Sequence, residues 1–261
     1  MNYLHEDADG ENIGELQLFN ILPKTTVIRR FPLWSGRRYF SMKNGQVWLG
    51  IGATTWKSHR MPSSKYLLDW YKSNGSDSDE ISSDLSNIGT FFHYLAGELV
   101  TAYANHQQYK ISKTKIAEDL RQFMLHKGMN MFDHAKYSSI LTKYLFSVAQ
   151  WLVEWDFRVE SVEFPVLIWE LNVATAIDIV GTCLPPNKIG NAEPTEGERV
   201  RVCVNIKTRL KAQNAYPDDA VQLGVEKAAY NAYCPTHPAD YAAVLCPVYT
   251  AASGSSYKFV F

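Results

Sequence analysis

The strongest constraint on the fold is a strand-helix-strand pattern in residues 200–249. An apolar run at 200–207 is followed by a helix-like stretch at 218–232 and by a second apolar run at 241–249. Two strands of one sheet that are joined through a helix lie parallel, and the crossover between them is right-handed. The pattern therefore predicts an α/β fold with at least one parallel strand pair.

Helical patterns come first in the chain and strand patterns second. Apolar residues recur at three- and four-residue steps in residues 86–103 and again in 140–155, which predicts two amphipathic helices. After Asp156, runs rich in β-branched and aromatic residues at 157–169 and 174–183 predict further strands. We expect a mixed central β-sheet that is flanked by helices.

The length of the chain, 261 residues, exceeds that of an average domain, but α/β folds of this size often form one unit. Hydrophobic residues make up 46% and charged residues 20%, which excludes a wholly disordered chain and a coiled coil. We expect a single domain over residues 1–261, with an N-terminal extension at 1–85 and the core at 86–261.

Neither membrane insertion nor export is indicated by the sequence. No apolar run reaches the roughly 18 to 20 residues of a membrane span, and the first ten residues are acidic rather than a basic leader. The four cysteines are widely spaced without a CxxC pair, which favours reduced core thiols over a zinc site. We therefore expect an intracellular, cytoplasmic protein without a membrane partner.

Positive charge is concentrated in one N-terminal segment, although the net charge of the chain is only -1. Residues 24–65 hold nine Lys or Arg residues and no Asp or Glu, and aromatic residues are interleaved with these cations. This mixture is typical of proteins that neutralise phosphates and stack the bases of single-stranded nucleic acid. A solvated β-rich segment with core aromatics would have the same composition. The candidate nucleic-acid-binding residues are Arg29, Arg30, Trp34, Arg37, Arg38, Trp56, Lys57 and Arg60.

Polar residues interrupt two of the predicted strands. Asp178 stands among apolar neighbours, where a carboxylate is costly unless it binds a metal ion, pairs with a cation or lies at an exposed edge. Asn205 and Lys207 are two residues apart on one strand, so their side chains point to the same face. Asp178 is thus a metal ligand, or else a turn-capping or ion-paired aspartate, and a polar pair ends the strand at 200–207.

Five short motifs follow one another in a definite order. They are Gly89-Thr90-x-x-His93 on a predicted helix, Glu163 on the next strand, Ile177-Asp178-Ile179, Asn205-Ile206-Lys207-Thr208, and Gln222-Leu223 on the following helix. In this order the chain resembles the RecB-type branch of the PD-(D/E)XK nuclease superfamily. Residues 54–72 also resemble the N-terminal part of phage and mitochondrial single-strand exonucleases of that branch. The resemblance covers roughly residues 50–249.

The resemblance implies a restriction-endonuclease-like core and a deoxyribonuclease that uses Mg²⁺ or Mn²⁺. By the same resemblance, the metal ligands are His93, Asp178 and residue 205, the catalytic lysine is Lys207, and Gln222 is the polar residue of the following helix. Glu163 is a weaker match, which either supports the site or faces solvent, and Gln222 could equally be an exposed helix residue. The metal would activate water and neutralise phosphate charge, and Lys207 would orient the water or stabilise the transition state.

Asn205 departs from the family pattern, which has Asp or Glu two residues before the lysine. An asparagine offers a hard cation only a neutral oxygen, so metal affinity should fall. Two interpretations stay open: the protein is naturally impaired or inactive, or this chain is an inactivated variant of an active enzyme.

We expect the chain to hydrolyse phosphodiester bonds of DNA as an exonuclease on single strands or free ends, in the manner of phage enzymes of DNA repair and recombination. The alternative is a non-catalytic nucleic-acid-binding module that keeps the nuclease fold. A third reading is a structural protein with a nuclease-like sheet. No Walker loop, His-Glu-x-x-His or Gly-x-Ser-x-Gly motif occurs, which disfavours P-loop and serine hydrolases.

Overall fold

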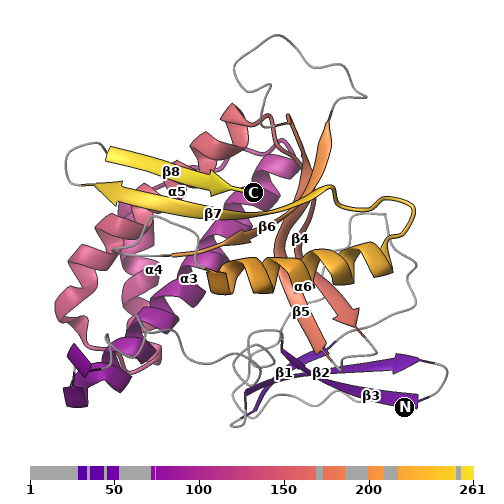
Figure 1. Ribbon diagram of the computed structural model, residues 1–261. Helices are drawn as coiled ribbons and strands as arrows, with labels where there is room; N and C mark the ends of the chain where they lie inside the picture. The colour runs from indigo at the N-terminus through magenta and orange to yellow at the C-terminus, as the bar shows by residue number, and fades with distance from the viewer. Residues whose placement is uncertain are drawn as a thin grey trace.

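The computed structural model of the chain describes residues 29–33, 36–43, 46–52, 72–73, 75–168, 173–185, 199–208, 217–250 and 254–261. Within these ranges the chain forms one eight-stranded mixed sheet with helices packed against it (Figure 1). The α/β class with a flanked mixed sheet, expected from the sequence, is confirmed. The division into an extension at 1–85 and a core at 86–261 stays a prediction.

The helical part at residues 75–154 is longer than its sequence pattern indicated. It consists of the 3-10 turn η1 (Gly75–Asp77), α3 (Ser78–Ala104), α4 (Lys113–His126), the 3-10 turn η2 (Met131–Asp133) and α5 (His134–Glu154). The predicted start of the first helix at residue 86 is wrong by eight residues. Asp79 and Glu80 lie in the first turn of α3, where the helix dipole favours negative charge.

The strands are β1 (Arg29–Leu33), β2 (Gly36–Lys43), β3 (Gln46–Gly52), β4 (Arg158–Ile168), β5 (Val173–Cys183), β6 (Val200–Ile206), β7 (Tyr241–Thr250) and β8 (Gly254–Val260). They follow the order β1-β2-β3-β5-β6-β7-β8, and β4 pairs with β5. The pairs β3/β5 and β6/β7 are parallel, and the remaining pairs are antiparallel. Strand β5 is therefore the hub of the sheet, since it contacts three neighbours.

The predicted strand-helix-strand unit is present. Strand β6 leads to α6 (Pro217–Tyr233) and then to β7, and β6 and β7 are parallel, as the connection through a helix requires. Proline suits the first position of a helix because it has no N–H that would need a partner there. The unit places α6 directly against the sheet beside β6 (Figure 1).

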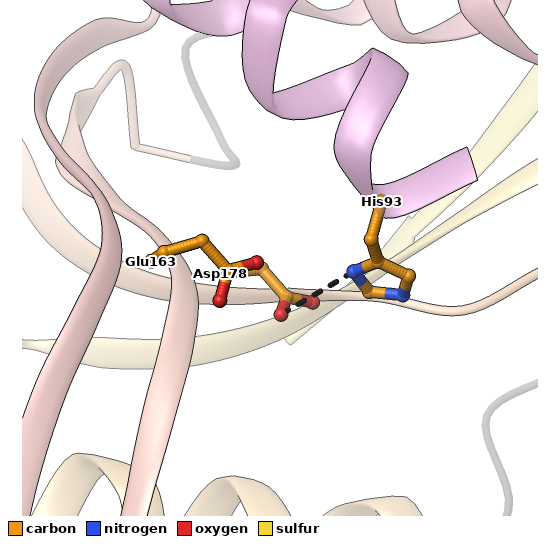
Figure 2. Close-up of side chains that lie close together, drawn as sticks. All are labelled: His93, Glu163 and Asp178. Atoms are coloured by element: carbon orange, nitrogen blue, oxygen red, sulfur yellow. Dashed lines mark ion pairs between the residues drawn. The ribbon is translucent and has the colours of Figure 1, made fainter. Parts of the chain in front are cut away.

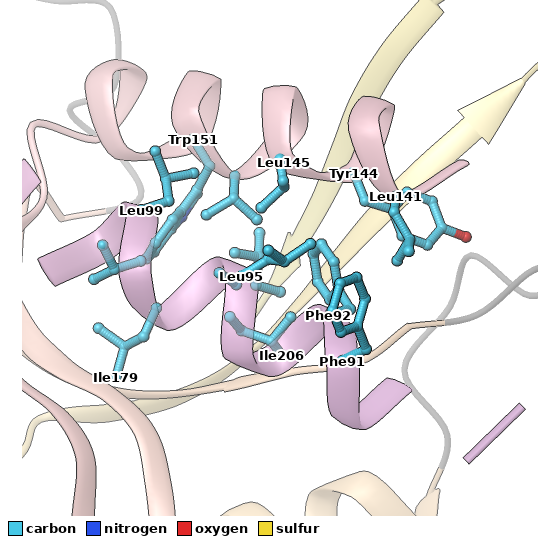
Figure 3. Close-up of a cluster of buried hydrophobic side chains, with 14 of the residues drawn as sticks. Phe91, Phe92, Leu95, Leu99, Leu141, Tyr144, Leu145, Trp151, Ile179 and Ile206 are labelled. Carbon is cyan, nitrogen blue, oxygen red and sulfur yellow. The ribbon is translucent and has the colours of Figure 1, made fainter. Parts of the chain in front are cut away.

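The two largest hydrophobic clusters of the described residues lie on opposite faces of the sheet. The larger joins α3, α4 and α5 to β5, β6, β7 and β8, and Figure 3 shows Leu95, Leu145 and Trp151 of its helices beside Ile179 and Ile206 of its strands. The smaller joins α6 to β4, β5 and β6. Strand β6 is buried on both faces, as expected for a strand with a parallel neighbour and helices on each side. None of the described helices is both long enough and apolar enough to cross a lipid bilayer.

Candidate metal centre and polar network

The candidate site begins at a change of face in the antiparallel pair β4/β5. The rung Val162–Ile179 packs into the larger cluster, whereas the rung Phe164–Ile177 packs into the smaller one. Glu163 and Asp178 lie between these two rungs on their respective strands, and their carboxylate oxygens come within 4.8 Å of each other. The backbone of Glu163 has a φ of 51°, a left-handed conformation that a residue with a side chain seldom adopts. Both carboxylates therefore lie where the paired strands pass from one core to the other.

Helix α3 brings a histidine to these two carboxylates. His93 Nδ1 lies 3.5 Å from Asp178 Oδ1. One ligand atom each from His93, Glu163 and Asp178 lie within 4.8 Å of one another, and Figure 2 shows the three side chains converging from α3, β4 and β5. We call these three residues the candidate metal cluster. Two carboxylates and an imidazole at this separation can hold a divalent cation.

The electrostatic surroundings keep the histidine and the aspartate paired. Burial alone would lower the pKa of His93, and the Lys207 ammonium lowers it further, but the Asp178 charge and hydrogen bond, with Glu163, raise it above its ordinary value. The second oxygen of Asp178, Oδ2, accepts a hydrogen bond of 2.6 Å from the backbone N–H of Ile206. Because one oxygen is held by β6 and the other faces His93, the Asp178 carboxylate has a fixed orientation.

On the next strand, Asn205 lies opposite Asp178 by continuation of the β5/β6 register, in which Ile179 pairs with Val204. Asn205 is only 4% exposed, and its Nδ2 donates to both carboxylate oxygens of Glu226 on α6, at 3.3 and 3.4 Å. Its Oδ1 is buried and has no hydrogen-bond partner within the described ranges. An unsatisfied buried carbonyl oxygen costs about 1 to 3 kcal/mol. A cation beside Asn205 would satisfy this oxygen.

Lys207 is connected to the same glutamate through one amide. Lys207 Nζ donates to Gln222 Oε1 at 2.9 Å, and Gln222 Nε2 donates to Glu226 Oε1 at 2.8 Å. We call Lys207, Gln222, Glu226 and Asn205 the polar network. Burial and the charge of Asp178 raise the pKa of Glu226 to about 8, although Gln222, Lys207 and Asn205 each act against this shift. Because the charge of Asp178 acts on Glu226, the polar network is electrostatically coupled to the candidate metal cluster.

Helix α3 approaches the end of β6 closely at Gly89. A Cβ atom at this position would lie 3.1 Å from Thr208 Oγ1, tighter than most real contacts. His93 is one helical turn further along α3, so the small residue at 89 lets the helix bring its histidine to the sheet. This is a structural reason for glycine in the Gly89-Thr90-x-x-His93 motif.

The structure brings together the polar residues singled out in the core. His93, Glu163 and Asp178 form one cluster, and Asn205, Lys207 and Gln222 belong to the adjoining network. Glu163, the weaker match to the family pattern, lies within the cluster. Asn205 and Lys207 both contact side chains of α6, so they share the face that strand alternation predicted.

The structure describes the proposed DNA-contacting residues in less detail than the core residues. The backbones of Arg29, Arg30, Arg37 and Arg38 belong to β1 and β2, and their side chains lie outside the described part of the chain. The remaining candidates, Trp34, Trp56, Lys57 and Arg60, lie outside the described residues altogether. Their role in binding nucleic acid stays a prediction.

Glu226 is the polar residue that sequence reasoning missed. Its side chain is fully buried, and it bonds both Asn205 and Gln222. The available signal was its spacing, since residues four apart on a helix share a face and Gln222 was already a candidate.

No protein-family model matches this chain, and no curated protein matches it either.

Proposed function

We propose that His93, Glu163 and Asp178 bind a divalent metal ion, Mg²⁺ or Mn²⁺, and that the site hydrolyses phosphodiester bonds of DNA. The observation that carries the proposal is the convergence of these three side chains, from three different elements, within 4.8 Å. We expect the substrate to be a single strand or a free DNA end, and the activity to be that of an exonuclease.

The donor set fits a hard cation. Carboxylate and amide oxygens suit Mg²⁺ and Mn²⁺, and the buried Oδ1 of Asn205 supplies a further oxygen that lacks a partner within the described residues. A site with cysteine ligands, as in structural zinc centres, is not formed by these side chains. The oxygen-rich donor set thus favours a hard divalent cation over a structural zinc ion.

A bound Mg²⁺ or Mn²⁺ would lower the pKa of a coordinated water and neutralise charge on the phosphate oxygens. The remaining work falls to residues of the chain. Asp178 is pre-oriented by the Ile206 N–H, so it need not reorganise when substrate binds. Lys207 places a positive charge at the end of β6, where it can orient the attacking water or stabilise negative charge that develops on phosphorus oxygens.

The position of the N-terminal strands supports a role in guiding DNA. Strand β3 pairs with β5 at Val173 and Ala174, and Asp178 follows on the same strand. Five residues of strand span about 16 Å, roughly the length of a few nucleotides of extended single strand. The basic and aromatic segment 24–65, to which β1 to β3 belong, is therefore attached to the strand that carries Asp178.

A second candidate function is a non-catalytic nucleic-acid-binding module. The observation that favours it is Asn205, whose neutral amide stands where a carboxylate would add charge to the metal site. Such a module would bind single strands through residues 24–65 without cutting them.

Cleavage of an end-labelled single-stranded oligonucleotide in Mn²⁺ tests the two functions. We expect wild-type activity to be low and Asn205→Asp to raise Mn²⁺-dependent cleavage, because a carboxylate strengthens the metal site. Lys207→Ala in the Asn205→Asp background should abolish cleavage and leave oligonucleotide binding largely intact. Oligonucleotide binding without cleavage by any variant would favour the binding module. Absence of both Mn²⁺ binding and oligonucleotide binding would contradict both functions.

We also propose that the protein is intracellular and cytoplasmic, and that it is encoded by a phage. The four cysteines are all buried and free. Burial raises the pKa of Cys183 to about 12, so its thiol is unreactive. Unpaired buried thiols are typical of proteins from reducing compartments.

A further inference from the structure

We propose that Glu226 is the positioning carboxylate of this site, and that it forms a matched pair with Asn205. In this pair helix α6 contributes a carboxyl group, which a divalent cation bound beside Asp178 would keep ionised, and strand β6 contributes an oriented amide. The inference rests on the proposed metal-dependent function and names a residue that acts on the metal and the lysine through two amides.

The first step of the argument is the direction of the hydrogen bonds. Asn205 Nδ2 and Gln222 Nε2 both donate to the carboxylate of Glu226. A carboxylate accepts hydrogen bonds only, so it selects the NH₂ side of each amide. Because the oxygen of an amide lies opposite its nitrogen, fixing one end fixes the other.

The second step is where the two amide oxygens then lie. Gln222 Oε1 accepts from the Lys207 ammonium at 2.9 Å, which an NH₂ group in that place could not do. Asn205 Oδ1 is left buried and without a partner among the described residues, on a side chain that lies opposite Asp178. By holding the two amide nitrogens, Glu226 thus turns the Gln222 oxygen toward Lys207 and leaves the Asn205 oxygen available to a cation.

The third step concerns the identity of residue 205. An aspartate there would place a second carboxylate about where Nδ2 now lies, 3.3 to 3.4 Å from the oxygens of Glu226. Both side chains are buried, Asn205 at 4% and Glu226 at 0% exposure. Two buried carboxylates at that distance cannot both be charged without a strong penalty. Asparagine at 205 is therefore the partner that a charged Glu226 requires.

Four chains test the pair: wild type, Asn205→Asp, Glu226→Gln and the double variant Asn205→Asp/Glu226→Gln, which exchanges the amide and the carboxylate. Urea unfolding is measured in EDTA at about pH 9, where free carboxyl groups are ionised. We expect Asn205→Asp to lower the unfolding midpoint, and the double variant to recover most of that loss. Non-additive effects of two substitutions report their direct interaction.

Mn²⁺ titration of the same chains tests the positioning role. Glu226→Gln should weaken Mn²⁺ binding by about 10- to 100-fold, as loss of a group that orients a ligand usually does. The double variant should bind Mn²⁺ more tightly than wild type, since the carboxylate then lies on β6. Glu160→Gln is the control: Glu160, on strand β4, is a partly exposed acid with a bidentate partner, Arg201, and its substitution should leave Mn²⁺ affinity unchanged.

The possible outcomes separate the inference from the proposed function. Additive stability effects, or wild-type Mn²⁺ affinity in Glu226→Gln, would overturn the inference. If Asn205→Asp does not fold but the double variant does, the pair is supported; if neither folds, the Mn²⁺ affinity of Glu226→Gln decides. Should none of the four chains bind Mn²⁺ while the stability effects stay non-additive, the pair is supported and the proposed function fails.

Discussion

The two faces of the sheet differ in what they bury. The face covered by α3, α4 and α5 buries a large, almost wholly apolar cluster, whereas the face covered by α6 buries a smaller cluster together with the polar network. Burying polar groups costs free energy unless they are paired, so a fold can hold them only where other packing supplies the stability. The comparison indicates that one face mainly maintains the fold and the other mainly serves the site.

Glu163 and Asp178 lie at the border between these faces. Their neighbours on one side pack into the larger cluster and those on the other side into the smaller one. His93 reaches them from α3, while Asp178 also influences Glu226 on the α6 face. Substitutions on the two faces should therefore have separable effects, on stability for the first and on metal binding or pH response for the second.

The largest effect is expected in the apolar cluster. Trp151 on α5 is fully buried, and its ring lies 4.6 Å from that of Phe157 and 5.2 Å from that of Phe259, between centroids. Trp151→Ala should lower the unfolding free energy by about 3 to 5 kcal/mol through the cavity it leaves. Urea unfolding measures this loss. Phe146→Ala, an exposed position on the same helix, should change stability by less than about 1 kcal/mol. Equal losses of unfolding free energy in Trp151→Ala and Phe146→Ala would contradict the stabilising role of the apolar cluster.

On the α6 face, the raised pKa of Glu226 predicts a pH-dependent stability. The pKa is about 8 in the folded protein and 4.5 in the unfolded chain, so the unfolded chain loses this proton first as pH rises. The stabilising contribution is complete below about pH 4.5 and is lost progressively up to about pH 8, a change on the order of a few kcal/mol.

Unfolding free energies measured in EDTA across this pH range check the prediction. Glu226→Gln cannot release a proton, so its profile should be flatter than that of wild type. Glu160→Gln keeps Glu226 and should retain the wild-type slope. Parallel profiles for wild type and Glu226→Gln would show that Glu226 ionises normally.

At the border itself, Asp178→Asn should change charge without changing shape. An asparagine oxygen can still accept from the Ile206 N–H, so stability should change little. Mn²⁺ affinity should fall by about 10- to 100-fold. The pKa of His93 should drop, because the Asp178 charge that raises this pKa is removed while burial still lowers it. Calorimetric Mn²⁺ titration and NMR titration of His93 in EDTA measure the two effects. Asp133→Asn, at an exposed ion pair with Lys136, should change neither. An unaltered His93 pKa in Asp178→Asn would contradict the pairing.

The fold could largely be predicted from the sequence because it depends on patterns that repeat along one element. Apolar periodicity indicated α3 and α5, and the strand-helix-strand spacing indicated the parallel pair β6/β7. Helix α4 was missed, although Ile116, Leu120 and Met124 recur at four-residue steps and are its buried residues. Its mostly polar composition hid a short apolar stripe.

The site could be predicted only where a motif marks a single residue. His93 and Asp178 stand in such motifs, whereas the place of Glu163 depends on a left-handed backbone that strand alternation does not foresee. Glu226 becomes important through Asn205, which is 21 residues away on a neighbouring strand. The four-residue spacing from Gln222 indicates the helix face of Glu226, but its contact with Asn205 follows from the packing of α6 on the sheet, which no local pattern records.

The smallest stability effect is expected at Glu163, where strain and metal binding oppose each other. A positive φ costs a residue with a side chain about 1 kcal/mol or more, and glycine adopts it freely. Glu163→Gly should therefore leave the unfolding midpoint unchanged or raise it slightly, by up to about 1 kcal/mol in free energy, while Mn²⁺ affinity falls. Arg158→Gly, at an exposed position of β4 with ordinary strand backbone, should instead lower the midpoint. A loss of stability in Glu163→Gly as large as in Arg158→Gly would mean that Glu163 stabilises the sheet. Stability kept while metal binding is lost would mean that the strained conformation serves the ion.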